Sequence, residues 1–258
     1  MKRLIVAVAT LVLALPGCSD EPAPKSEFDG MRAFRDLRAQ VEIGPRPAGS
    51  RGGAEVVRLI AGRLRAAGTE DVRVQRPWRN VVATIPGSAP GVIVVGAHHD
   101  TKTGVGPDFA GANDGASGVA VVLELARVLA DDAPRSGPSI RIALFDAEEA
   151  RGDRPFDEDG TRGSRQYVAY AERGAQGSPP LDEIRAMVLF DLVGDCDLQI
   201  PYEAGSDPGL YAEFAEAAEM VDGSPSPFIG ETAGVMDDHL PFLARGIPAV
   251  GLIDFTYG

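Results

Sequence analysis

The stretch Gly91-Val92-Ile93-Val94-Val95-Gly96-Ala97-His98-His99-Asp100 decides the fold of this chain. Residues 92–97 are almost entirely apolar and several are β-branched, which is typical of a central strand that is buried on both faces. His98 and Asp100, two side chains that can bind a metal ion, follow as soon as the apolar run ends. The sequence therefore predicts a buried strand that carries functional groups at its carboxyl end.

Further strands and helices alternate along the chain on both sides of this run. Apolar, β-branched runs predict strands at 80–85, 140–145, 187–190 and 247–253. Apolar residues at helical spacing predict helices at 54–67, 116–130, from about 164 to 172, and 208–221. The Pro- and Gly-rich residues 86–91 predict a turn between two of the strands. This alternation predicts an α/β three-layer sandwich, with a mainly parallel, mixed central sheet and helices on both faces.

Length and charge narrow the class of protein. The chain has 258 residues, of which 44% are hydrophobic, so it is long enough for one large domain with a substantial core. Its formal net charge of −13 would repel phosphate backbones and anionic membrane surfaces. We therefore expect no nucleic-acid partner, and contact with a membrane only through a lipid anchor.

The first 18 residues resemble a bacterial lipoprotein signal peptide. Met1-Lys2-Arg3 supply positive charge, and the apolar run 4–15 is too short to span a membrane. Leu15-Pro16-Gly17-Cys18 resembles the motif in which the Cys is lipidated, and simple secretion with an incidental Cys18 is the alternative. Residues 19–27 would be a flexible tether. We expect an exported protein that is anchored by lipid on Cys18 and faces the periplasm or cell exterior, or is secreted.

Acidic side chains and a histidine stand at the ends of three predicted strands. They are His98 and Asp100 after the first strand, Asp146, Glu148 and Glu149 after the second, and Asp191 at the end of the third. In an open α/β sheet the carboxyl ends of the strands border the crevice where ligands bind, so these groups should converge. Carboxylates gathered in this way repel one another unless a cation neutralises them. A His among carboxylates suits zinc, and manganese or cobalt would also be compatible.

Each of these residues also has a purely structural explanation. His98 alone could be a hydrogen-bonded structural residue, and an adjacent Glu pair often begins a solvated helix. Asp114, which precedes Gly115, could simply cap the predicted helix 116–130. Asp191 is harder to explain in this way, because a charge directly after an apolar strand needs a partner. Together, the groups favour a metal site.

Several motifs occur in the order in which one known family carries them. They are GPRPAGS at 44–50, GAHHDT at 96–101, GANDGASG at 111–118, FDAEEA at 145–150, FDLVGD at 190–195 and DDHLPFLARGIP at 237–248. From about Phe28 to Gly258 the chain resembles the zinc aminopeptidases of metallopeptidase family 28, a group that includes the glutaminyl cyclases. The resemblance implies a zinc aminopeptidase-like fold and a zinc centre.

The resemblance implies a centre with two zinc ions. Asp114 would bridge the ions, His98 and Asp191 would bind one of them, and Glu149 would bind the other. The family supplies a further histidine ligand shortly after the last strand, but this chain ends at 254–258 before such a motif. We therefore expect residues 28–258 to be a catalytic domain lacking its C-terminal end, with a fragment favoured over a natural loss. One zinc ion or an incomplete second site would result.

The resemblance also assigns residues that would move protons or contact substrate. Glu148 would be the general base, and Asp100 would orient His98. Asp237 matches a proton-shuttling aspartate of the cyclases. His239 is a candidate residue of the substrate pocket.

Two reactions at the N-terminus of a peptide or protein compete as the function. An aminopeptidase would use metal-activated water and Glu148 to hydrolyse the first peptide bond, whereas a glutaminyl cyclase would convert N-terminal Gln to pyroglutamate. The insert 150–162 resembles that of cyclases, but it lacks their Trp, since Trp78 is the only one in the chain, and Gly251 stands where they carry a His. We rank the exopeptidase first, the cyclase second, and a non-catalytic surface binding module third.

Overall fold

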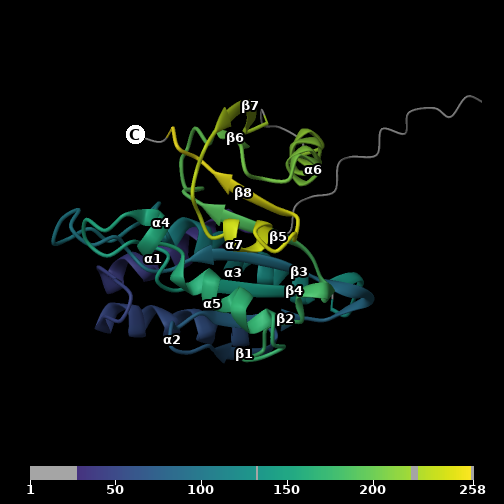
Figure 1. Ribbon diagram of the computed structural model, residues 1–258, viewed down its shortest axis with the longest axis horizontal. Coiled ribbons are helices and arrows are strands. Elements are labelled where there is room, and N and C mark those ends of the chain that lie inside the picture. The colour runs from purple at the N-terminus through teal and green to yellow at the C-terminus, as the bar shows by residue number, and fades with distance from the viewer. Residues whose placement is uncertain (1–27, 132, 222–225, 257–258) are drawn as a thin grey trace, which may run out of the picture.

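The computed structural model describes residues 28–131, 133–221 and 226–256, and a six-stranded sheet lies at its centre (Figure 1). The strands are β1 (Glu70–Val74), β2 (Val81–Ile85), β3 (Gly87–His98), β4 (Arg135–Phe145), β5 (Ile184–Asp191) and β8 (Ala249–Ile253). Their order across the sheet is β1-β2-β4-β3-β5-β8. The pairs β3-β4, β3-β5 and β5-β8 are parallel, whereas β1-β2 and β2-β4 are antiparallel. The mainly parallel, mixed sheet is confirmed.

Helices cover both faces of this sheet, as predicted. The helices nearest to it are α1 (Gly30–Ile43), α2 (Arg51–Ala66), α3 (Ala116–Asp131), α5 (Arg162–Ala171) and α7 (Leu240–Leu243). Val95 of β3 lies in a core built with α2 and α3, while its neighbour Val94 lies in the core built with α5 and α7. Because successive side chains of a strand point to opposite faces, β3 is buried on both sides, as its apolar sequence requires.

A smaller unit packs beside β8. It consists of the parallel strands β6 (Ile200–Glu203) and β7 (Phe228–Ala233) and the helix α6 (Pro208–Glu219), which lie together beyond β8 in Figure 1. Val250 and Leu252 of β8 share a hydrophobic core with residues of α6, such as Leu210. Two short helices, α4 (Phe156–Asp159) and η1 (Leu181–Glu183), complete the fold.

The predicted turn at 86–91 is wrong. β3 begins at Gly87, and these residues pair with the start of β4 through an irregular register, Gly87 with Arg135 and Ala89 with Pro138. β4 therefore lies between β2 and β3, which do not pair with each other. Pro and Gly are tolerated here because the segment lies at the irregular beginning of the strand.

Within the described ranges, no helix is long and apolar enough to cross a membrane. The predicted signal peptide, Cys18 and the tether 19–27 lie outside the residues that the structure describes.

Candidate active site

Two neighbouring strands bring His98 and Asp191 to the same place. Side chains alternate along a strand, so His98 shares a face of β3 with Val94, and Asp191 shares a face of β5 with Met187. Val94 and Met187 are partners across these parallel strands and lie in one core. His98 and Asp191 therefore meet at the carboxyl edge of the sheet.

Asp114 joins them from the loop that precedes α3. Gly115 has a φ of 86° and approaches His98 so closely that a Cβ there would lie 3.1 Å from His98 Cε1. Asp114 Oδ1 lies 3.2 Å from His98 Nε2, and Asp191 Oδ1 lies 3.3 Å from the same nitrogen. The three donor atoms lie within 4.8 Å of one another. The structure therefore brings together His98, Asp114 and Asp191, which the resemblance had named as metal ligands.

The donor set of this cluster fits a zinc ion. Imidazole nitrogen and carboxylate oxygens are zinc ligands, and a site with three protein ligands keeps a position open for chemistry. Burial alone would lower the pKa of His98, but the carboxylates of Glu148 and Asp191 outweigh it and raise the pKa well above its ordinary value. The surroundings thus favour positive charge at this point, which a divalent cation would supply.

Asp100 fixes the two glutamates that follow β4. Its carboxylate accepts hydrogen bonds from the backbone amides of Glu148, at 3.0 Å, and Glu149, at 3.3 Å. The same carboxylate lies 3.6 Å from Nδ1 of His98, the ring nitrogen that does not face Asp114. Asp100 therefore ties the loop of Glu148 to the strand of His98, and its carboxylate also faces the imidazole.

Glu148 is a buried carboxyl group beside the cluster. Its Oε2 lies 3.8 Å from His98 Nδ1. Burial raises the pKa of Glu148 well above its ordinary value, and the carboxylates of Asp237 and Asp238 add to this effect. Asp237 is buried in the loop before α7, and burial together with Asp191 raises its pKa as well. Two carboxyl groups that can hold protons therefore lie next to the candidate metal centre.

Glu149 lies next to Asp114 but outside the three-residue cluster. Its Oε2 is 3.2 Å from Nζ of Lys102. Burial and then the charge of Asp114 raise the pKa of Glu149 to about 7. In the part of the chain that the structure describes, His98, Asp114 and Asp191 are the only three donors close enough to hold one ion. Glu149 therefore does not belong to the cluster of candidate metal ligands.

His239 is buried in a contact with Glu203. Its Nε2 lies 2.8 Å from Glu203 Oε2, and Ser206 Oγ donates to the same oxygen at 3.0 Å. The ring packs on Gly251, where a Cβ would lie 3.2 Å from His239 Cε1. The structure therefore places this candidate pocket residue behind the site, where only 1% of its surface is exposed.

Asp146, another carboxylate at a strand end, turns away from the cluster. Its Oδ2 accepts a hydrogen bond of 3.0 Å from the backbone amide of Arg79, and its own amide donates to Asn80 Oδ1. Asp146 therefore holds the start of β2 against the end of β4.

Arg46 shapes the site, although its motif GPRPAGS predicted no specific role for it. Its buried guanidinium donates to the carbonyl oxygens of Gln40, Gly44, His99, Ala110 and Gly111. Burial lowers the pKa of Arg46 to about 10, although the negative charges of Asp100 and Asp114 act to raise it. Because Arg46 binds both ends of the segment 99–111, it closes the loop that leads to Asp114.

Residues 80–258, well over half of the chain, match peptidase family M28. The chain belongs to this family. The crystal structure of an Acidobacteriales bacterium glutaminyl cyclase matches this M28 chain with a TM-score of 0.77 at 32% identity, over 92% of this chain and 84% of the other. A leucine aminopeptidase precursor from Bacteroides thetaiotaomicron matches with a TM-score of 0.73 at 25% identity, over 90% and 88% of the two chains. The zinc aminopeptidase-like fold is confirmed.

Among curated relatives, the glutaminyl-peptide cyclotransferase of Drosophila melanogaster is 26% identical to this M28 chain over 212 residues. The match covers 70% of this chain and 56% of that protein. The chain thus spans less than two thirds of the length of this relative. The relatives of this M28 chain therefore include proteins named as glutaminyl cyclases and as an aminopeptidase.

Proposed function

We propose that this protein is a zinc-dependent enzyme that acts on the free amino-terminal residue of peptides, and that it cyclises N-terminal glutamine to pyroglutamate. The observation that carries the proposal is the buried Glu148 carboxyl, 3.8 Å from His98 and beside the cluster of three metal-ligand candidates. A group that can accept and return a proton next to a cation site suits amide chemistry.

His98, Asp114 and Asp191 would hold the zinc ion. When bound, the ion would supply a Lewis acid that polarises the carbonyl of the substrate's side-chain amide. The surplus of carboxylates around the cluster would attract the positively charged α-amino group of the incoming peptide.

Glu148 would move one proton during the reaction. The α-amino group of the substrate loses its extra proton to solvent and reacts as the neutral amine. Its nitrogen forms a bond to the carbon of the side-chain amide, and the bond from that carbon to the amide nitrogen breaks. Glu148 accepts a proton from the attacking amine and delivers it to the leaving nitrogen, which departs as ammonia. Water is not consumed, and Glu148 ends the cycle as it began.

The comparisons are compatible with both reactions, and we propose cyclisation although the sequence motifs ranked hydrolysis first. The Acidobacteriales structure and the Drosophila relative both carry the cyclase name. One sequence argument against a cyclase was the absence of a His at Gly251. In the structure the imidazole of His239 packs on Gly251 but is buried against Glu203, so it does not replace that histidine, and this argument against a cyclase stands.

An aminopeptidase is the second candidate. The leucine aminopeptidase precursor shares the fold at a similar TM-score. The same Glu148 could take a proton from water and return it to a leaving amine. The two reactions differ in whether water or the substrate's own amine attacks.

Mass spectrometry of peptides separates these reactions. Zinc-loaded protein is incubated with a peptide that begins with Gln, and the Glu148→Gln variant is the control. Loss of ammonia alone, absent in the variant, supports cyclisation, whereas release of the whole first residue supports the aminopeptidase. If zinc-loaded protein changes neither this peptide nor one that begins with Leu, both proposals are contradicted and the non-catalytic binding module takes their place.

We also propose export and lipidation at Cys18, on the strength of the N-terminal sequence alone. Incorporation of labelled palmitate by bacteria that express the protein, and its loss in Cys18→Ala, would support the anchor. Unlabelled protein in the culture medium would instead indicate plain secretion.

A further inference from the structure

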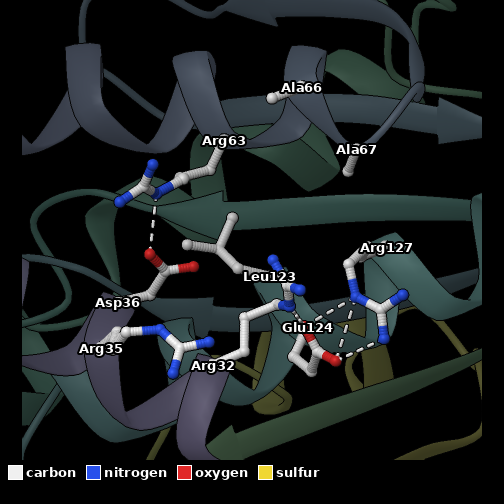
Figure 2. A pocket seen from close by; sticks show the side chains of 9 residues that line it. All are labelled: Arg32, Arg35, Asp36, Arg63, Ala66, Ala67, Leu123, Glu124 and Arg127. Carbon is white, nitrogen blue, oxygen red and sulfur yellow. Dashed lines mark hydrogen bonds and ion pairs between the residues drawn. The ribbon is translucent and has the colours of Figure 1, made fainter. Parts of the chain in front are cut away.

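A cavity of about 260 Å³ opens between α1, α2 and α3, away from the candidate active site (Figure 2). Its charged lining consists of Arg32, Arg35, Asp36, Arg63, Glu124 and Arg127, which we call the arginine pocket. Glu124 lies on α3, roughly two turns beyond the start of the helix that follows Asp114. Arginines outnumber acids here although the whole chain carries a net charge of −13.

The two acids of the arginine pocket are already neutralised. Glu124 is 1% exposed. The guanidinium group of Arg127 donates two hydrogen bonds to its carboxylate, from Nη2 to Oε1 at 2.6 Å and from Nε to Oε2 at 3.0 Å. Asp36 accepts a hydrogen bond of 2.7 Å from Nε of Arg63. Arg127 and Arg63 therefore make the short contacts to these two acids, and Arg32 and Arg35 have only longer contacts to acidic side chains.

Arg32 and Arg35 make only long ion-pair contacts with acidic side chains. Arg32 Nε lies 3.7 Å from Glu124 and 3.9 Å from Asp29, and Arg35 Nη2 lies 3.7 Å from Asp29. Within the described residues, neither guanidinium makes a hydrogen bond at normal length. The two residues are three apart on α1, a spacing at which like charges lie side by side and repel. Asp29 Oδ2 relieves part of this repulsion from 3.7–3.9 Å, and an anion within hydrogen-bond distance of both guanidinium groups would relieve it further.

We propose that the arginine pocket binds a phosphate group. The guanidinium fork matches phosphate oxygens, and Arg32 and Arg35 present unused donors from α1 while Arg63 approaches from α2, as Figure 2 shows. One arginine satisfies a planar carboxylate, whereas a tetrahedral phosphate offers enough oxygens for several arginines that approach from different directions. A phosphate group thus fits this arrangement better than a carboxylate.

Thermal unfolding with increasing inorganic phosphate, at constant ionic strength, tests the proposal. A ligand that binds only the folded state raises the unfolding midpoint in a saturable way. We expect such a rise for the natural protein, and an apparent Kd at least tenfold weaker for Arg35→Gln, whose side chain is exposed and makes no hydrogen bond that folding needs. Arg58→Gln, which removes an exposed arginine of α2 outside the pocket, should leave the Kd unchanged.

Glycerol 3-phosphate, used in the same titration, distinguishes the source of the group. Tighter binding than inorganic phosphate would assign an organic phosphate ester, and weaker binding would assign the free ion. A midpoint that does not rise with either compound would overturn the proposal. So would a rise that is equal in the natural protein, Arg35→Gln and the double variant Arg32→Gln/Arg35→Gln.

Discussion

The carboxylate of Asp100 and the backbone amide of Glu148 are joined by a hydrogen bond of 3.0 Å. This bond links the loop after β3, which follows the metal-ligand candidate His98, to the loop after β4, which carries the proposed proton-transfer group. The buried carboxylate of Asp100 therefore adds to the pairing of β3 with β4 in setting the relative position of the two groups.

Asp100→Asn should lower turnover by about 10- to 100-fold, because the amide side chain keeps only one acceptor oxygen for the two backbone amides and loses the charge that faces His98. Steady-state assays of the reaction identified by mass spectrometry measure this loss. Asp108→Asn, at an exposed aspartate of the following loop, should be without effect. Equal rates for the two variants would contradict this role of Asp100.

Glu148→Gln should retain zinc but lose roughly 10²- to 10⁴-fold in turnover, because the amide has the size of the acid but cannot shuttle a proton. Metal analysis and activity measured on the same sample check both parts. If the variant turns over normally, Glu148 is not the proton-transfer group.

Arg46→Met should destabilise the fold by about 3 kcal/mol or more, because buried carbonyl oxygens lose their donor. Urea unfolding monitored by circular dichroism gives this free energy. Arg58→Met, in which an exposed arginine is lost, is the control and should change stability by less than about 0.5 kcal/mol. If Arg46→Met lowers the free energy of unfolding by no more than Arg58→Met does, the contacts of Arg46 with the carbonyl oxygens do not contribute to stability.

The pair of Glu203 and His239 should make stability fall in acid. Burial alone would raise the pKa of Glu203, but the hydrogen bond from His239 and the amide of Gly205 outweigh it and lower the pKa to about 2. A carboxyl group whose pKa is lower in the folded state stabilises the protein above its unfolded pKa of about 4.3. This contribution, roughly 2 kcal/mol, should disappear as the pH falls from about 5 to about 2. Unfolding free energies of the natural protein and Glu203→Gln should therefore converge at low pH, and a constant difference would refute the assignment.

Gly118→Ala should destabilise the protein by about 1–3 kcal/mol, because a Cβ in α3 would collide with the backbone oxygen of Phe190. Gly62 in α2 has open space around the same position, so Gly62→Ala should instead stabilise the protein by about 0.5–1 kcal/mol. Thermal unfolding of the two variants gives opposite shifts under this account. Shifts of the same sign would contradict the close approach of α3 to the sheet.

The elements that the sequence predicted are those with a continuous apolar pattern. Buried apolar residues form continuous runs in the strands β3, β4, β5 and β8, and they line one long face of the helix α3. Such hydrophobic patterns clearly indicate a strand or a helix. The helix α1 was missed because charged residues interrupt its apolar positions, and Met31 and Phe34 are exposed. The strand β1 was missed because it is largely exposed and lacks an apolar run, and β6 was missed because it has only four residues.

The candidate metal ligands could be predicted because they stand at strand ends and in motifs with known relatives. The roles of Arg46 and of Asp100 toward the glutamate loop could not, because their partners are backbone groups, which leave no mark in the sequence. The strand pattern alone does not separate Asp191 from Asp146, since both follow Phe at the end of an apolar strand, whereas the family motifs indicated Asp191. In the structure Asp191 faces His98, and Asp146 accepts a hydrogen bond from the backbone amide of Arg79.

Zinc titration of Asp191→Asn and Asp146→Asn tests the central claim most directly, because both variants change one buried carboxylate at the end of a parallel strand. If His98, Asp114 and Asp191 form the metal centre, isothermal titration calorimetry should show zinc affinity weakened by at least about 100-fold in Asp191→Asn and preserved in Asp146→Asn. Equal zinc affinity in Asp191→Asn and the natural protein would contradict the metal centre and the function proposed from it.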